Sequence, residues 1–165
     1  MTRTSDLKIE ANGEREMVMT RSFAAPRELV FEALTRPELV RRWLGGMEGW
    51  TMPVCEIDLR VGGRYRYLWR KEDEGIEMGM GGVYREIVAP ARIVATEKFD
   101  DAWYPGEAVG TFELVESGGA TKLTQTMRYD SRAARDAVLA SPMEDGVEMS
   151  YDRLEAVVTE TQASA

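Results

Sequence analysis

Residues 141–158, SPMEDGVEMSYDRLEAVV, place apolar side chains on one face of a single long helix. The face is defined by Met143, Val147, Tyr151, Leu154 and Val158, which are spaced by 4, 4, 3 and 4 positions. Such spacing is typical of an amphipathic helix, whose apolar stripe has to be buried against a second surface. Ser141-Pro142-Met143-Glu144 has the form of a capping box, which predicts that the helix begins at Pro142.

The partner surface is predicted by a period-two pattern in the middle of the chain. Residues 64–70, RYRYLWR, alternate Tyr65, Tyr67 and Trp69 with basic side chains and a leucine. Alternation of this kind predicts a strand with one buried and one exposed face. Weaker versions recur in the segments 6–10, 15–23, 54–59, 77–88, 92–99, 107–116 and 121–129. Because glycine-rich turns such as 117–119 join successive segments, we expect a curved antiparallel sheet of about six to seven strands.

Two short helices are predicted after the first strand. The first covers Pro26–Leu34, and the second starts at a capping box formed by Thr35-Arg36-Pro37-Glu38 and ends near Trp43. The length of 165 residues is typical of one α+β domain, which we place at residues 6–160. We expect residues 1–5 and 161–165 to be flexible termini.

The composition favours binding over catalysis. The chain has no histidine, one cysteine (Cys55) and a formal net charge of −8. Without histidine the usual general base and metal ligand are missing, so we assign no catalytic residue, no metal site and no cofactor. An acidic chain with no basic stripe is a poor partner for nucleic acid. The lack of a long apolar run argues against membrane insertion and, with the lone cysteine, favours the cytoplasm.

The aromatic face of the sheet and the helix stripe predict either an ordinary core or a cavity for a small hydrophobic or lipid-like molecule. Two polar side chains, Glu97 and Gln125, fall on the apolar face by the period-two count. A carboxylate there has to pair with an arginine, lie at the cavity mouth, or serve as an acid or base. The candidate cavity residues are Trp43, Tyr67, Trp69, Tyr84, Glu97, Phe99, Phe112, Gln125, Met127, Val147 and Tyr151.

Glycines interrupt two elements. Residues 78–82, MGMGG, lie inside a strand and predict a bend or bulge, since no phosphate-loop lysine follows. Gly146 lies in the long helix, where glycine is unfavourable by roughly 1 kcal/mol relative to alanine. It permits either a close approach to the sheet or an opening into the cavity.

Four segments together resemble a known family. They are REMVMTRSFAAPRELVFEALTRPELVRRWLGG (15–46), EIDLRVGGRYRYLWR (56–70), GGVYREIVAPARIVATEKFDD (81–101) and RDAVLASPMEDGVEMSYDRLEAVV (135–158). The resemblance is to the activator-of-heat-shock-protein-90-ATPase-like family. That family belongs to the START-like superfamily of helix-grip folds, with the polyketide cyclases and the major birch pollen allergen.

The resemblance implies a cavity between the long helix and the concave sheet, with no shared catalytic residue. It matches Trp43, Gly62, Gly63, Gly146 and Leu154 to structural positions of the family. Three positions depart from the pattern: Ala25 replaces an aspartate, Val61 a proline and Val147 a frequent tryptophan. The alternatives to ligand binding are an enzyme of cyclase or hydrolase type in the same cavity and a chaperone-associated regulatory module. A homodimer and a chaperone contact both stay open at this level.

Overall fold

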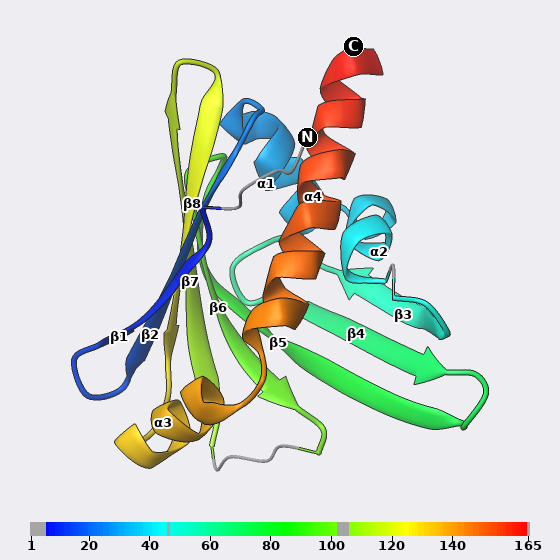
Figure 1. The fold of residues 1–165 in the computed structure, drawn as a ribbon, viewed down its shortest axis with the longest axis vertical. Helices are drawn as coiled ribbons and strands as arrows, with labels where there is room; N and C mark the ends of the chain where they lie inside the picture. Colours follow the sequence, from blue (N-terminus) through cyan, green and yellow to red (C-terminus); the bar gives the residue numbers. More distant parts are fainter. Residues whose placement is uncertain (1–5, 46, 102–105, 165) are drawn as a thin grey trace.

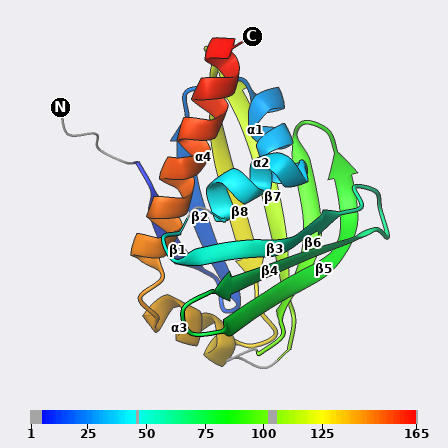
Figure 2. The ribbon, with the colours of Figure 1, turned by 90° about the vertical axis from the view of Figure 1, so that its right-hand side faces the viewer.

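The computed structural model describes residues 6–45, 47–101 and 106–164. Their centre is one open antiparallel sheet with the strand order β1-β2-β8-β7-β6-β5-β4-β3. The sheet curves strongly, so that β3, β4 and β5 turn away from the other strands in Figure 1 and cross in front of them in the view of Figure 2. The strands are β1 (Lys8–Asn12), β2 (Glu16–Phe23), β3 (Trp50–Ile57), β4 (Arg64–Lys71), β5 (Ile76–Val88), β6 (Arg92–Phe99), β7 (Ala108–Ser117) and β8 (Ala120–Arg128).

The helices lie mainly on the concave side of this sheet. α1 (Arg27–Thr35) and α2 (Pro37–Leu44) connect β2 to β3, and α3 (Arg132–Ala140) leads into the long α4 (Glu144–Ser164). Figures 1 and 2 show α4 beside α1 and α2, with α3 at the far end of the sheet. The predicted α+β helix-grip class is therefore confirmed.

The sheet has eight strands rather than the predicted six to seven. The weak segment predicted at 6–10 does form a strand, β1, which pairs with β2 from Lys8 opposite Thr20 to Asn12 opposite Glu16. It is a short edge strand whose side chains are mostly exposed, so the apolar alternation that marks the inner strands is weak there.

Both predicted capping boxes are wrong. Thr35 ends α1, where its hydroxyl donates to the carbonyl of Phe31, and Arg36 occupies the cap position of α2 without a side-chain hydrogen bond. Ser141 caps the end of α3, and α4 begins at Glu144 instead of Pro142. In each case two helices follow each other so closely that the polar residue serves the helix that ends. Ser131 is a true N-cap, because its Oγ accepts from the Ala134 N–H at 3.1 Å.

The alternation in β4 separates the two faces of the sheet as predicted. Tyr65, Tyr67 and Trp69 are buried on the concave face. Apart from Arg21, the basic residues of the sheet lie on the outer face, where acidic side chains pair with several of them. These pairs are Arg66 with Asp100 (2.7 Å), Arg70 with Glu77 (2.6 Å), Arg92 with Glu86 (3.1 Å) and Arg92 with Glu113 (3.0 Å).

The glycines of β5 allow the strand to bend, as the sequence predicts. A Cβ placed on Gly82 would lie 1.8 Å from the carbonyl oxygen of Thr96 on β6, and the register shifts between Tyr84 and Glu86. A Cβ on Gly79 would collide with the carboxylate of Asp100 at 2.2 Å. The bend turns the β3–β5 part of the sheet around the concave side.

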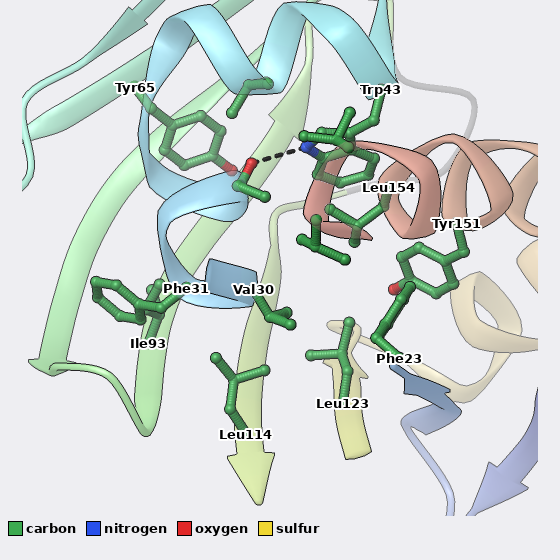
Figure 3. Packing of buried hydrophobic residues seen from close by; sticks show 14 of the residues in the cluster. Phe23, Val30, Phe31, Trp43, Tyr65, Ile93, Leu114, Leu123, Tyr151 and Leu154 are labelled. Atoms are coloured by element: carbon green, nitrogen blue, oxygen red, sulfur yellow. Dashed lines mark hydrogen bonds between the residues drawn. The ribbon is translucent and has the colours of Figure 1, made fainter. Parts of the chain in front are cut away.

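The core lies between the sheet, α1, α2 and the second half of α4. Val30 and Leu154 are fully buried against Leu123 and Leu114, which face them from β8 and β7 (Figure 3). Each such aliphatic side chain contributes roughly 1.5–3 kcal/mol by leaving water. This part of the concave side is therefore solid and holds α4 in place.

The two terminal segments that we expected to be flexible have different outcomes. The expected flexible segment 1–5 and Ala165 lie outside the described residues. Residues 161–164, which we also expected to be flexible, form the last turn of α4. None of the helices described is both long and apolar enough to cross a lipid bilayer.

Candidate functional site

Where the core ends, the concave side of the sheet encloses a cavity of about 500 Å³. Its floor is formed by inward side chains of β2 and of β4 to β8. Its other walls come from the end of α2, from α3 and the segment after it, and from the first turns of α4. The curvature of the sheet produces this space, because α4 bridges the concave face without filling it.

All eleven candidate residues of the sequence line this cavity. Trp43 comes from α2, Val147 and Tyr151 from α4, and the other eight from five strands of the sheet. Five of them, Trp43, Tyr67, Trp69, Tyr84 and Tyr151, also belong to the packed core, so core and cavity wall share these side chains. That these side chains contact a ligand stays a prediction.

Methionine supplies much of the wall, and of these methionines the candidate list of the sequence analysis contains only Met127. Seven of the ten methionines of the chain line the cavity. The period-two pattern contains the signal, since Met17 and Met19 share the face of Phe23, and Met80 shares that of Tyr84. Flexible thioether side chains make an adaptable wall. The seven are Met17, Met19, Met47, Met78, Met80, Met127 and Met143.

A row of aromatic rings forms the wall on β4 and β5. The ring centroid of Tyr65 lies 5.2 Å from that of Tyr67 and 5.5 Å from that of Tyr84, and Tyr67 lies 5.9 Å from Trp69. Burial raises the pKa of Tyr67 and of Tyr84, so both phenols are neutral at physiological pH. This wall offers large apolar surfaces with polar tips.

Most polar groups of the aromatic wall are already bonded to the protein. The indole N–H of Trp43 donates to the Ala33 carbonyl at 2.7 Å (Figure 3). The indole N–H of Trp69 donates to Leu44, and the Tyr65 hydroxyl donates to Thr96. These groups are therefore not free to select a ligand.

Gln125 is fixed by its neighbours on both sides. Its Oε1 accepts a hydrogen bond from the hydroxyl of Tyr151 on α4, and its amide nitrogen lies 3.4 Å from the sulfur of Met127. Burial raises the pKa of Tyr151, and the charge of the nearby Glu97 raises it to a smaller extent. The bond joins α4 to β8 across the cavity and explains a polar residue on the apolar face.

Glu97 differs from the other polar residues described above, because its side chain has no bonding partner in the part of the cavity wall that the structure describes. It makes no hydrogen bond or ion pair with any residue in the described parts of the chain, and loss of water raises its pKa to about 7. Of the alternatives that the sequence left open, pairing with an arginine does not occur among those residues, and Arg66, Arg70 and Arg92 pair with other carboxylates on the outer face. A carboxyl group that titrates near neutrality can either accept or donate a proton inside the cavity.

Two further features limit the chemistry. Burial raises the pKa of Cys55 to about 11, and its thiol contacts the Pro37 carbonyl, so it is a poor nucleophile. Within the residues described, no three acidic or cysteine side chains are close enough together to hold a metal ion.

Gly146 marks an opening beside the cavity. It lines the cavity and is also exposed, and a Cβ added there would meet no atom within 4 Å. A close approach of α4 to the sheet at this residue is therefore contradicted. The helix leaves open space at Gly146 itself, whereas Met143 and Val147 on the same turns pack against the cluster that contains Met17, Met19 and Met127.

A family model described as "Activator of Hsp90 ATPase homolog 1-like protein" matches residues 24–159. A search of curated proteins gives no match.

Several solved structures share the fold along the chain. A Rhodobacter sphaeroides protein is 31% identical with a TM-score of 0.86, covering 94% of this chain and 99% of its own. A Chromobacterium violaceum protein is also 31% identical, with a TM-score of 0.73, covering 87% of this chain and 96% of its own. An HSP90 activator from Plasmodium falciparum is 26% identical with a TM-score of 0.54, covering 69% of this chain and 72% of its own.

Proposed function

This chain belongs to the activator of Hsp90 ATPase homolog 1-like family, and from that premise we propose that it binds a small, largely apolar molecule in the cavity beneath α4. The observation that carries the proposal is the cavity itself. Its volume of about 500 Å³ lies within the roughly 300–1,000 Å³ that is usual for small-molecule sites.

The wall supports an apolar ligand over a polar one. It consists mainly of methionine, aromatic and aliphatic side chains, and its two indole groups and the hydroxyls of Tyr65 and Tyr151 are bonded to the protein. An apolar molecule would lose no hydrogen bonds to these groups and would release the water that covers the wall. A strongly polar molecule would find few partners there.

The proposal is tested first on the protein as purified. Native mass spectrometry of the freshly isolated chain should show a retained apolar molecule, or the empty protein should gain thermal stability with neutral apolar probes. Two such probes are 2-naphthylmethanol and dodecanol, which differ in shape but both fit an apolar cavity. If no molecule is retained and neither probe raises Tm or binds in calorimetry, ligand binding is refuted.

A second candidate function is regulation of a chaperone ATPase. The observation that favours it is the similarity to the Plasmodium falciparum HSP90 activator. The test measures the ATPase rate of the Hsp90-type chaperone from the same cell with and without this chain. Stimulation that survives when the cavity is filled by Val147→Trp would assign the activity to the outer surface. Loss of stimulation in that variant would couple it to the cavity.

A further inference from the structure

We propose that the ligand of this cavity carries a basic nitrogen and that the Glu97 carboxylate pairs with it as an ammonium group. The inference rests on the proposed function, because it requires a molecule in the cavity. It adds a chemical class: an amine with an aromatic or alkyl body.

The sheet leaves the carboxylate of Glu97 uncovered. Its neighbour across β7 is Ala108, and Gly110 is opposite Ala95, the next inward residue of β6. On β5, Gly82 follows Gly81, which pairs with Lys98. The neighbours of Glu97 on β7 and the preceding inward residue of β6 thus carry small side chains or none, whereas Phe99 and its partner Met80 supply larger ones, and Glu97 lines the cavity.

The described chain offers no cation to this carboxylate. Arg66, Arg70 and Arg92 are paired with carboxylates on the outer face, and Arg21, on the concave face, lies 2.7 Å from Asp152. A carboxylate removed from water is unfavourable unless it gains a partner or a proton. An ammonium group supplied by the ligand would provide that partner, with its charge and its hydrogen-bond donors.

Aromatic rings around Glu97 favour the same ligand. Burial raises the pKa of both Tyr67 and Tyr151, and the charge of Glu97 adds to the rise in each, so their phenols lie near it. Ring faces attract cations, and the effect is larger away from water. The other titratable groups facing the cavity are also phenols: Tyr65, Tyr84 and Tyr129. No second carboxylate lines the described cavity wall, so one cation matches its charge.

The opening has the sign of charge that attracts a cation. Glu144, Asp145 and Glu148 flank Gly146 on α4, and the whole chain carries −8. An anionic ligand such as a fatty acid would meet like charge at the entrance and again at Glu97. A neutral alcohol would enter but leave the carboxylate without a cation.

The test compares three ligands with the same naphthalene body: 2-naphthylmethylamine, 2-naphthylmethanol and 2-naphthoic acid. Calorimetry at pH 8 should show the amine binding at least about tenfold more tightly than the alcohol, with the acid weakest. In Glu97→Gln the amine should lose this advantage, while the alcohol should bind as it does to the unchanged protein. Glu113→Gln removes a charge from the outer face of the same sheet and should leave all three affinities as they are.

A second measurement detects the proton on Glu97. With a pKa of about 7 in the empty cavity, the carboxyl must release its proton when an ammonium binds below that pH. The affinity for the amine should therefore rise about tenfold from pH 6 to pH 8 in the unchanged protein and stay level in Glu97→Gln. Calorimetry at pH 6 in buffers of different ionisation enthalpy should show nearly one proton released.

The outcomes separate the two proposals. If amine and alcohol bind the unchanged protein equally, or if Glu97→Gln keeps the preference for the amine, the inference is overturned while apolar binding stands. If none of the three probes, nor dodecylamine or dodecanol, binds at either pH, both proposals are overturned.

Discussion

Arg21 of β2 directs a fully buried guanidinium group toward Asp152 of α4, with 2.7 Å between Nη2 and Oδ1. The guanidinium carbon also lies 5.3 Å from the ring centre of Phe23. Among the residues that the structure describes, neither Nη2 nor Nε of Arg21 finds a well-aligned hydrogen-bond partner, so the contact with Asp152 is mainly electrostatic. The ion pair ties the middle of α4 to the sheet at the border between core and cavity.

Loss of the Asp152 carboxylate should destabilise the fold. Asp152→Asn would leave the Arg21 charge buried without its counter-charge, which is more unfavourable than losing a surface pair. Since the Asp152 side chain is 49% exposed, solvent reduces the effect, and we expect a loss of about 1–3 kcal/mol. Urea denaturation measures this difference.

The double variant isolates the cause. Arg21→Met replaces the cation by an apolar side chain of similar length, so adding Asp152→Asn to it should change the free energy of unfolding little further. Equal losses from Asp152→Asn with and without Arg21 would show that the pair is not what matters.

The carboxyl group of Glu97 should make stability depend on pH. Burial raises its folded pKa from 4.5 to about 7, so between these values the folded chain holds a proton that the unfolded chain releases. Its contribution therefore favours folding at low pH and is lost as pH rises through this window, by up to about 3 kcal/mol. Urea denaturation of Glu97→Gln should show a stability gain over the unchanged protein that grows from pH 4.5 to pH 7.5.

An exposed carboxylate supplies the control for this pH effect. Glu10→Gln on β1 changes the same chemical group outside the cavity and should follow the unchanged protein at every pH. A constant difference between Glu97→Gln and the unchanged protein across the pH range would contradict a buried, titrating Glu97.

Two glycines should respond oppositely to alanine. At Gly146 the added Cβ meets nothing, so Gly146→Ala should stabilise the chain by about 0.5–1 kcal/mol through helix propensity. At Gly82 the Cβ would lie 1.8 Å from the Thr96 carbonyl oxygen, so Gly82→Ala should destabilise it by more than about 1 kcal/mol. Thermal denaturation distinguishes the two signs, and a loss at Gly146 would mean that α4 lies closer to the sheet.

Filling the cavity should block binding without weakening the fold. Val147 is half-buried in the wall, and Val147→Trp would place an indole in the open space. We expect the affinity for neutral 2-naphthylmethanol to fall at least about tenfold, with Tm unchanged or higher. Met149→Trp alters the exposed side of the same helix and should bind the probe normally. An unchanged affinity in Val147→Trp would place the probe elsewhere.

Much of the architecture could be predicted because one periodicity decides it. The alternation of Tyr65, Tyr67 and Trp69 with charged residues assigns each side chain to a face, and the structure follows it. The stripe of α4 was also predictable, but it divides in a way that the pattern does not show. Leu154 and Val158 are buried in the core, whereas Val147 lines the cavity. Whether an apolar face meets protein or empty space depends on the curvature of the sheet.

Helix ends and polar contacts were harder to predict for a related reason. Thr35 and Ser141 match the capping-box pattern, yet each lies at the end of the preceding helix. Where two helices follow each other closely, the sequence alone does not show whether a polar residue between them ends the first or begins the second. Arg21 falls on the apolar face by the same count that places Met19 and Phe23, and its partner Asp152 is 131 positions away along the chain. Pairing over such a distance needs the fold.

The two halves of α4 are held very differently. From Glu144 to Ser150 no side chain is buried, whereas Tyr151, Leu154, Val157 and Val158 all are. Amide hydrogens of the first two turns should therefore exchange with deuterium faster than those from Tyr151 onward, and a bound ligand should slow the first group selectively. The second half of α4 would then anchor the core, while transient opening of its first turns would let a ligand enter and leave the cavity.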